Sequence, residues 1–168
     1  ANWDRIGSLY IRGDLGLDWS WVKYERNGDL AWCGAFAAYC YGTAGLRHEI
    51  RYRHMASCSR LCAWSKDNER RIDWRETGDI RAGDIVIVGK PSYKRTGQHI
   101  TICERFDPAA GLVYTIEGNA HGRLPSGAWK EGVVTRERPL PSDALSDDVM
   151  RVMHVIRPLP EDFVARDG

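Results

Sequence analysis

Residues 29–45 read DLAWCGAFAAYCYGTAG, and this stretch decides the fold. It overlaps the longest run without a charged residue, residues 30–46. Asp29 is a residue type that caps the start of a helix, and Gly45 is the type that often follows the end of one. We therefore predict a buried helix from Leu30 to about Ala44. A membrane-spanning helix needs about 20 apolar residues, so this shorter run with its glycines is not expected to cross a membrane.

The rest of the chain changes from helical to strand-like character. Residues 17–26 can form a short amphipathic helix, and residues 54–66 a second helix with an apolar stripe. From Gly83 onward, short runs rich in Val, Ile, Thr and Tyr alternate with Gly, Pro and Asp, which is typical of strands and turns. The stripe consists of Met55, Cys58, Leu61 and Cys62, and the predicted strands cover residues 84–88, 98–106, 112–118, 132–137 and 150–157. Helices followed by consecutive strands predict an α+β fold, with N-terminal helices on an antiparallel β-sheet of about five or six strands.

Length and composition predict one domain. The chain has 168 residues, and we expect its core to lie within residues 29–157. Its 24 basic and 23 acidic residues nearly cancel, so no surface for nucleic acid is predicted, and the basic cluster Arg47–Arg53 is interpreted as a solvated face. The N-terminal sequence has no signal-peptide pattern. Five cysteines do not suit a disulfide framework, so at least one thiol is expected to be free.

Cys33 lies in the first turn of the predicted buried helix. Unpaired backbone N–H groups and the positive end of the helix dipole favour a thiolate at this position. A small buried thiol without chemistry is the ordinary interpretation of a cysteine in an apolar helix, and it suits Cys40, further along the same face. Cys33 is therefore a candidate nucleophile whose role depends on a partner elsewhere in the chain.

His99 is the candidate partner, because it begins a predicted strand that turns at residues 107–111 and returns to Glu117 and Asn119. Side chains that face each other across a hairpin have Cβ atoms about 5 Å apart, and diagonal neighbours are about 7 Å apart. Either Glu117 or Asn119 can therefore hold the imidazole of His99. A helix-start cysteine, a strand histidine and a polar orienting residue form the order needed for a thiolate–imidazolium pair.

This arrangement depends on the register of the hairpin. A loop of residues 107–111 pairs Phe106 with Leu112 and leaves an odd number of residues between the strands. Counting back gives two further opposed pairs, His99 with Asn119 and Thr101 with Glu117. These four side chains then share one face of the hairpin, because strand side chains alternate. A two-residue loop would break this pairing.

Four segments of the sequence resemble the cysteine, histidine-dependent amidohydrolase/peptidase family, called CHAP. They are AWCGAFA (residues 31–37), RAGDIVIV (81–88), QHITI (98–102) and YTIEGN (114–119), within a similarity that covers residues 29–121. CHAP domains belong with the NlpC-like and papain-like hydrolases, so the resemblance implies a papain-like fold of helices against an antiparallel sheet. Its members typically cleave peptidoglycan in the stem peptide or cross-bridge, or between muramic acid and L-alanine. The resemblance places the nucleophile on Cys33, the base on His99, and the acidic and amide partners on Glu117 and Asn119.

The mechanism implied by these residues is thiol hydrolysis of an amide. The Cys33 thiolate attacks the carbonyl carbon, the backbone N–H of Cys33 holds part of the oxyanion, and His99 protonates the leaving amine before water hydrolyses the thioester. A second oxyanion donor is needed, and either Asn27 or Tyr24, just upstream, can supply it.

No cofactor and no metal ion are expected. His54, Cys58 and Cys62 repeat at four-residue spacing, but the apolar stripe explains that spacing and no fourth ligand is apparent. Asp14 and Asp18 do not match the spacing of a calcium loop.

We therefore expect an enzyme, a cysteine peptidase or amidase that lyses bacterial cell wall. The expected partner is its peptidoglycan substrate, with no nucleic acid and no membrane insertion, and a wall-binding domain or a phage or secretion partner can lie outside this chain. Its expected place of action is the periplasmic or extracellular face of the wall, reached by phage release or by another export route. Two alternatives stay open. The same residues can serve an acyltransferase or a non-wall amidase, or the fold can be a catalytically inert binding module.

Overall fold

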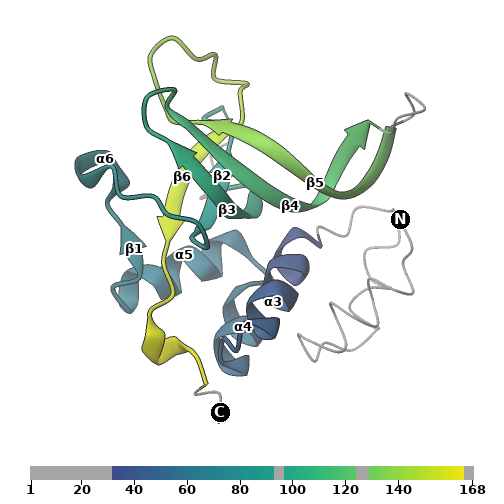
Figure 1. The fold of residues 1–168 in the computed structure, drawn as a ribbon, viewed down its shortest axis with the longest axis vertical. Coiled ribbons are helices and arrows are strands. Elements are labelled where there is room, and N and C mark those ends of the chain that lie inside the picture. The colour runs from purple at the N-terminus through teal and green to yellow at the C-terminus, as the bar shows by residue number, and fades with distance from the viewer. Residues whose placement is uncertain (1–31, 93–96, 124–128, 165–168) are drawn as a thin grey trace.

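Six antiparallel strands form one open sheet in the order β1-β6-β2-β3-β4-β5 (Figure 1). The structure is a computed structural model that describes residues 32–92, 97–123 and 129–164. The strands are β1 (Arg71–Ile72), β2 (Ile85–Gly89), β3 (His99–Asp107), β4 (Leu112–Arg123), β5 (Trp129–Pro139) and β6 (Arg151–Ile156). The helices are α3 (Cys33–Thr43), α4 (His48–His54), α5 (Cys58–Asp67) and α6 (Trp74–Thr77), with a 3-10 turn η2 (Pro160–Asp162). The predicted α+β class with an antiparallel sheet is confirmed.

Helix α3 is the predicted buried helix, but it starts later than expected. Trp32 is its N-cap and has a non-helical backbone (φ −87°, ψ 12°), so the start predicted at Leu30 is wrong. The predicted cap Asp29 and the predicted helix over residues 17–26 lie outside the described residues. At the other end the chain leaves the helix at Gly45, whose φ of 96° is a conformation that glycine adopts without strain.

The helix predicted over residues 54–66 is wrong as a continuous element. The chain breaks it between α4 and α5, where Ser57 has an extended backbone and its side-chain oxygen accepts a hydrogen bond from the N–H of Arg60. Serine caps a helix start in this way, and the cap favours a new helix over a continued one. The apolar stripe still faces the core, because Met55, Leu61 and Cys62 are buried and Cys58 is half-buried.

The five predicted strands are present as β2 to β6, with shifted ends. Strand β2 reads IVIVG and is buried along its whole length, because the two sheet faces carry separate apolar layers. Ile85 and Ile87 belong to the layer that contains α3, α4 and α5, whereas Val86 and Val88 belong to the layer that contains Trp74 of α6. Strand β1 and helix α6 were not predicted, because elements this short contain too few residues for a periodic pattern.

The β3–β4 hairpin differs from the predicted register near its loop. Asp107 pairs with Leu112, so the loop is the four residues 108–111 and the predicted pair of Phe106 with Leu112 is wrong. An extra residue, Glu104, then forms a β-bulge on β3 and shifts the register by one. Beyond the bulge the pairs are Cys103–Thr115 and Ile102–Ile116. These pairs match the register predicted for the part of the hairpin that leads to His99.

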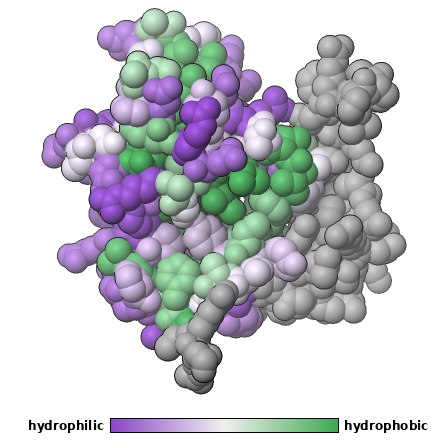
Figure 2. Space-filling view, in the orientation of Figure 1, coloured by the Kyte–Doolittle hydropathy of each residue, from purple (hydrophilic) through white to green (hydrophobic). Residues whose placement is uncertain are grey.

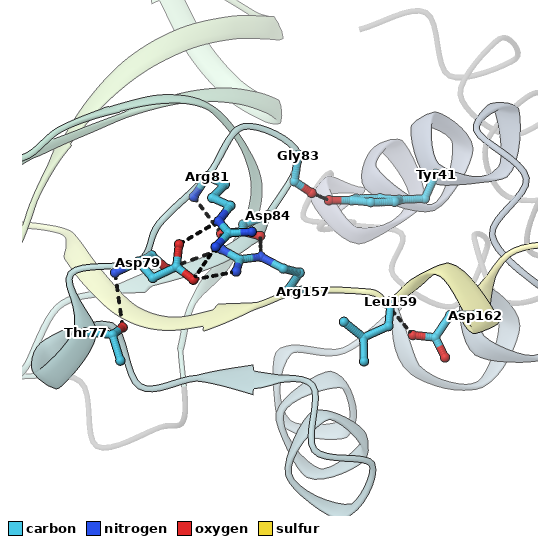
Figure 3. Close-up of polar contacts among 9 residues, drawn as sticks. All are labelled: Tyr41, Thr77, Asp79, Arg81, Gly83, Asp84, Arg157, Leu159 and Asp162. Carbon is cyan, nitrogen blue, oxygen red and sulfur yellow. Dashed lines mark hydrogen bonds and ion pairs between the residues drawn. The ribbon is translucent and has the colours of Figure 1, made fainter.

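The turn before β2 is closed by charged side chains around Asp84 (Figure 3). Arg157 donates two hydrogen bonds to this carboxylate, each 2.7 Å long. Its guanidinium also donates to Asp79, at 2.8 Å. In the same view, the hydroxyl of Tyr41 on α3 donates to the carbonyl of Gly83. This contact attaches α3 to the turn that the charged residues close.

In the space-filling view the surface is largely hydrophilic around α6 and β1 (Figure 2). Hydrophobic areas are visible over the middle of the molecule and toward the right of this view, where β4 and β5 extend away from the other strands. The basic cluster Arg47–Arg53 forms most of α4, and Arg47, His48 and Glu49 are exposed while Ile50 is buried. In the parts of the chain that the structure describes, no helix is long and apolar enough to cross a membrane.

Candidate active site

Cys33 is the first residue of α3 and is 5% exposed. The helix start is held close to the chain between α4 and α5, because a Cβ atom added to Gly34 would lie 1.9 Å from the carbonyl oxygen of Met55. Only glycine permits this approach. The backbone N–H groups of the first helical turn have no intrahelical acceptor, and that of Gly34 is a donor to the sulfur.

His99 begins β3 and presents its imidazole to the sulfur of Cys33. Burial alone would raise the pKa of the Cys33 thiol, but the side-chain hydrogen bond and charge of His99 and the backbone N–H groups of Ile100 and Gly34 outweigh it and lower the pKa. Burial alone would lower the pKa of His99, but hydrogen bonds and charges from Cys33 and Glu117 raise it to about 9. Both directions favour a thiolate beside an imidazolium.

Glu117 contacts the other side of the imidazole. The Nε2 atom of His99 lies 3.1 Å from Oε2 of Glu117, whose side chain has no exposed surface. Since Nε2 faces the carboxylate, Nδ1 is the ring nitrogen left for the sulfur of Cys33. Burial alone would raise the pKa of Glu117, but the hydrogen bonds of His99, Arg138 and Thr115 and the charge of Arg138 lower it to about 2. Glu117 is therefore a carboxylate at neutral pH.

Asn119 does not occupy the place predicted for it directly opposite His99. A β-bulge interrupts the pairing of β4 with β5 between Glu117 and Ala120, and Asn119 lies in it with a φ of 58°. Among the described residues, the side chain of Asn119 makes no hydrogen bond with His99; both residues line a cavity of about 340 Å³ on the carboxylate side of the imidazole. Of the two predicted orienting residues, the structure brings Glu117 into contact with the imidazole.

Arg138 and Thr115 complete the site and were not predicted. Arg138 on β5 donates from Nε to Oε1 of Glu117 at 2.7 Å and from Nη2 to Oε2 at 2.6 Å. The hydroxyl of Thr115 donates to Oε1 at 2.6 Å. Alternation along β4 was a signal for Thr115, which is two residues from Glu117 on the same face. Arg138 could be found only from the β4–β5 register, in which it pairs with Val113.

A second close approach holds α3 against this hairpin. A Cβ atom on Gly118 would lie 2.5 Å from Cβ of Phe36, one turn into α3 from Cys33. Gly34, in the first turn of α3, lets the helix start lie close to Met55. Gly118, on β4, lets the helix that carries the thiol lie close to the strand that carries the carboxylate.

The other cysteines with a shifted pKa behave in the opposite way. Burial raises the pKa of Cys58 to about 12, with contributions from the neighbouring Cys33 and Cys62, and it raises the pKa of Cys62 as well. Burial and the charge of Asp84 raise the pKa of Cys103 to about 11. Cys33 thus differs from these three thiols because a histidine faces it.

His54, Cys58 and Cys62 are not placed to share a metal ion. Within residues 32–92, 97–123 and 129–164, no three His, Cys, Asp or Glu side chains are placed to share an ion. His54 stacks on Trp64, with ring centroids 5.8 Å apart. Four other residues that the sequence analysis considered, Asp14, Asp18, Tyr24 and Asn27, lie outside the described residues.

Comparison with known proteins adds no relative to this picture. No protein-family model matches the sequence, and neither a curated protein nor a solved structure matches the chain. Function is therefore inferred from the geometry of the Cys33 site.

The chemistry of this geometry is specific. A buried sulfur at a helix start faces an imidazole that a buried carboxylate holds from behind. The sulfur is a nucleophile when ionised, and the imidazolium is a proton donor for a leaving group. Such a set of groups is suited to acyl transfer from an amide, with water or an amine as the acceptor.

Proposed function

We propose that this protein is a papain-like cysteine hydrolase of the CHAP type that cleaves an amide bond in bacterial peptidoglycan. The observation that supports this proposal best is the line of three buried groups, Cys33, His99 and Glu117. The order in which α3, β3 and β4 supply these groups is the order expected for this family. The resemblance of the four segments around these residues leads to the cell wall as the substrate.

The reaction begins when the thiolate of Cys33 attacks the carbonyl carbon of the scissile amide. The resulting oxyanion lies at the start of α3, where unpaired N–H groups and the helix dipole stabilise negative charge. His99 gives its proton to the leaving amine, and the C–N bond breaks to leave a thioester on Cys33. Neutral His99 then takes a proton from water, whose oxygen attacks the thioester and releases the carboxylic acid.

This function places the working enzyme outside the cytoplasm, at the peptidoglycan. Both an endopeptidase acting on the stem peptide or cross-bridge and an N-acetylmuramoyl-L-alanine amidase would use the steps above, because each breaks an amide. We propose no resident metal or organic cofactor, since the thiolate and the imidazolium supply the nucleophile and the acid.

The test is digestion of purified sacculi and of soluble muropeptides, with mass spectrometry of the fragments. We expect the wild-type protein to release fragments with a new amine and a new carboxylic acid. Cys33→Ala should lower turnover by at least about 1,000-fold, because the nucleophile is absent. Cys103→Ala is the matched control: it also removes a buried thiol, but one on the sheet face away from α3, and should leave turnover per folded molecule unchanged.

Two results would contradict the proposal. If a large excess of folded enzyme leaves sacculi and muropeptides intact, the cell-wall assignment fails. If Cys33→Ala digests the wall as fast as the wild type, the thiol mechanism fails.

A further inference from the structure

Glu117 is a fully buried carboxylate with three hydrogen-bonding side chains. Two of its contacts are with charged or chargeable groups, Arg138 and His99. An ionised carboxylate without a partner is costly to bury, and such a group takes up a proton instead. Arg138 is the permanently charged one of these partners, so it favours the anionic form of Glu117 whether or not His99 is protonated.

Arg138 is well placed to fix both the charge and the orientation of this carboxylate. Its guanidinium contacts both oxygens in the parallel two-point geometry that arginine forms with carboxylates. Only 14% of its side chain is exposed, so solvent screens this pair little. The same Oε2 atom that receives Nη2 of Arg138 lies 3.1 Å from Nε2 of His99. Any rotation of the carboxylate away from Arg138 would also move it away from the imidazole.

We propose that Arg138 is a positioning residue for the Cys33–His99 pair: it keeps Glu117 ionised and in one orientation, so that Glu117 holds a protonated His99 against the sulfur. This inference rests on the proposed function in one respect: both require the ion pair between the Cys33 thiolate and the His99 imidazolium. Arg138 acts through Glu117, because its guanidinium contacts both oxygens of that carboxylate.

The charged and titratable groups around the pair come from each element that meets it in the described chain. The members are Cys33 on α3, Cys58 on α5, His99 on β3, Glu117 on β4, and Arg136 and Arg138 on β5. Cys58 stays a neutral thiol through the physiological range, since its pKa is about 12. Arg136 lines the cavity beside His99, whereas Arg138 makes the two-point contact with Glu117.

Removing Arg138 lowers the fraction of Cys33 that is present as thiolate, whichever group of the cluster takes up a proton. If Glu117 stays ionised, the cluster carries an extra negative charge and Cys33 tends to protonate. If Glu117 protonates, the His99 imidazolium loses the carboxylate that stabilises its positive charge. His99 is then protonated for less of the time, so the Cys33 thiolate loses part of the positive charge beside it. Both routes predict less thiolate at mildly acidic pH.

The experiment measures the rate of iodoacetamide alkylation at Cys33 from pH 4 to pH 9 on the whole protein, with each cysteine peptide quantified by mass spectrometry. It needs no substrate. We expect Arg138→Met to move the midpoint of the Cys33 profile upward by about one pH unit or more, which lowers the rate about tenfold at pH values below the wild-type midpoint. Arg138→Lys, which keeps the charge but not the two-point contact, should give a smaller upward shift.

Arg70→Met is the matched control. Arg70 has the same 14% exposure and makes a similar two-point contact with Asp162, at 2.7 and 3.1 Å, but this pair lies beside η2 and touches neither His99 nor Cys33. Its loss should lower stability and leave the Cys33 profile unchanged. In a Glu117→Gln background, Arg138→Met should cause little further shift, because the group through which Arg138 acts is already neutral.

A wild-type Cys33 profile at low pH that Arg138→Met does not move would overturn the inference and leave the proposed function standing. If Arg138→Met does not fold, an unshifted profile in Arg138→Lys would overturn the inference equally. If wild-type Cys33 reacts like an ordinary thiol, no ion pair exists, and the inference and the proposed function both fail.

Discussion

Two buried carboxylates in this protein are held by an arginine in almost the same way. Glu117 is bound by Arg138 through contacts of 2.7 and 2.6 Å, and Asp84 is bound by Arg157 through two contacts of 2.7 Å (Figure 3). The exposed fractions are 0% for Glu117 and 1% for Asp84. Local geometry alone would assign both pairs the same role.

The third partner separates the two regions. Asp84 accepts a further hydrogen bond from the backbone N–H of Arg81, at 2.8 Å, so its partners are a permanent cation and the main chain. Glu117 faces His99, whose imidazole can take up or release a proton. The Arg157–Asp84 pair therefore stabilises a turn, whereas the Arg138–Glu117 pair can influence the protonation of a histidine.

The largest effect that tests this comparison comes from replacing each carboxylate by its amide. Glu117→Gln and Asp84→Asn both break a buried ion pair, so each should lower the free energy of unfolding by about 3–5 kcal/mol. Only Glu117→Gln should also lower turnover per folded molecule, by roughly 100- to 10,000-fold, because the imidazolium loses the anion that orients it. Muropeptide hydrolysis and urea unfolding of the same samples measure both quantities. Equal losses of turnover in the two variants would show that the regions do not differ in role.

A smaller effect is expected in the pH dependence. The pKa of His99 is raised to about 9, from about 6.5 in the unfolded chain, so its stabilising contribution is complete below about 6.5 and is lost as the pH rises through 9. The pKa of Glu117 is lowered to about 2, so its contribution is present above about 4.5 and is lost as the pH falls through 2. Turnover should fall about tenfold per pH unit above about 9, since neutral His99 cannot protonate the leaving amine.

The fall in turnover above about pH 9 forms the alkaline limb of the pH profile, and its position also distinguishes Glu117 from Asp84. Glu117→Gln should move the limb to lower pH, because His99 loses the carboxylate that raises its pKa. Asp84→Asn should leave the limb where it is. A titration of the His99 ring proton by NMR follows the same shift without substrate, and an unmoved midpoint in Glu117→Gln would contradict the assignment.

Most of the fold and the centre of the candidate site could be predicted from the sequence, for physical reasons. A charge-free run next to a glycine identified α3, and runs of alternating Val and Ile identified the strands. Cys33 and His99 stood out because each begins its element. Glu117 followed, together with Asn119 as the alternative, from the alternation of side chains along a hairpin.

The hairpin register was predicted only in part, because the sequence carries no signal for the bulge at Glu104. The loop has an even number of residues, which by itself would turn the wrong face of β4 toward His99. The bulge restores the alignment before the strand reaches Glu117. The pairs of β3 with β4 end at Ile102–Ile116, so the predicted pair of His99 with Asn119 is not formed, and Asn119 lies in a second bulge where β4 pairs with β5. Arg138 could not be predicted, since its contact depends on how β5 aligns with β4.

The smallest effect concerns the helix that joins the two regions. Helix α3 carries Cys33 at its start and Tyr41 near its end, where the hydroxyl donates to the carbonyl of Gly83 beside Asp84. Tyr41→Phe removes one hydrogen bond and should lower the free energy of unfolding by about 1 kcal/mol in urea denaturation. Since Tyr41 lies roughly 12 Å along the helix from Cys33, the alkylation profile of Cys33 should not change. A shifted profile in Tyr41→Phe would mean that a change at the Asp84 turn alters the thiol through α3. The Arg157–Asp84 pair and the Arg138–Glu117 pair would then be energetically coupled.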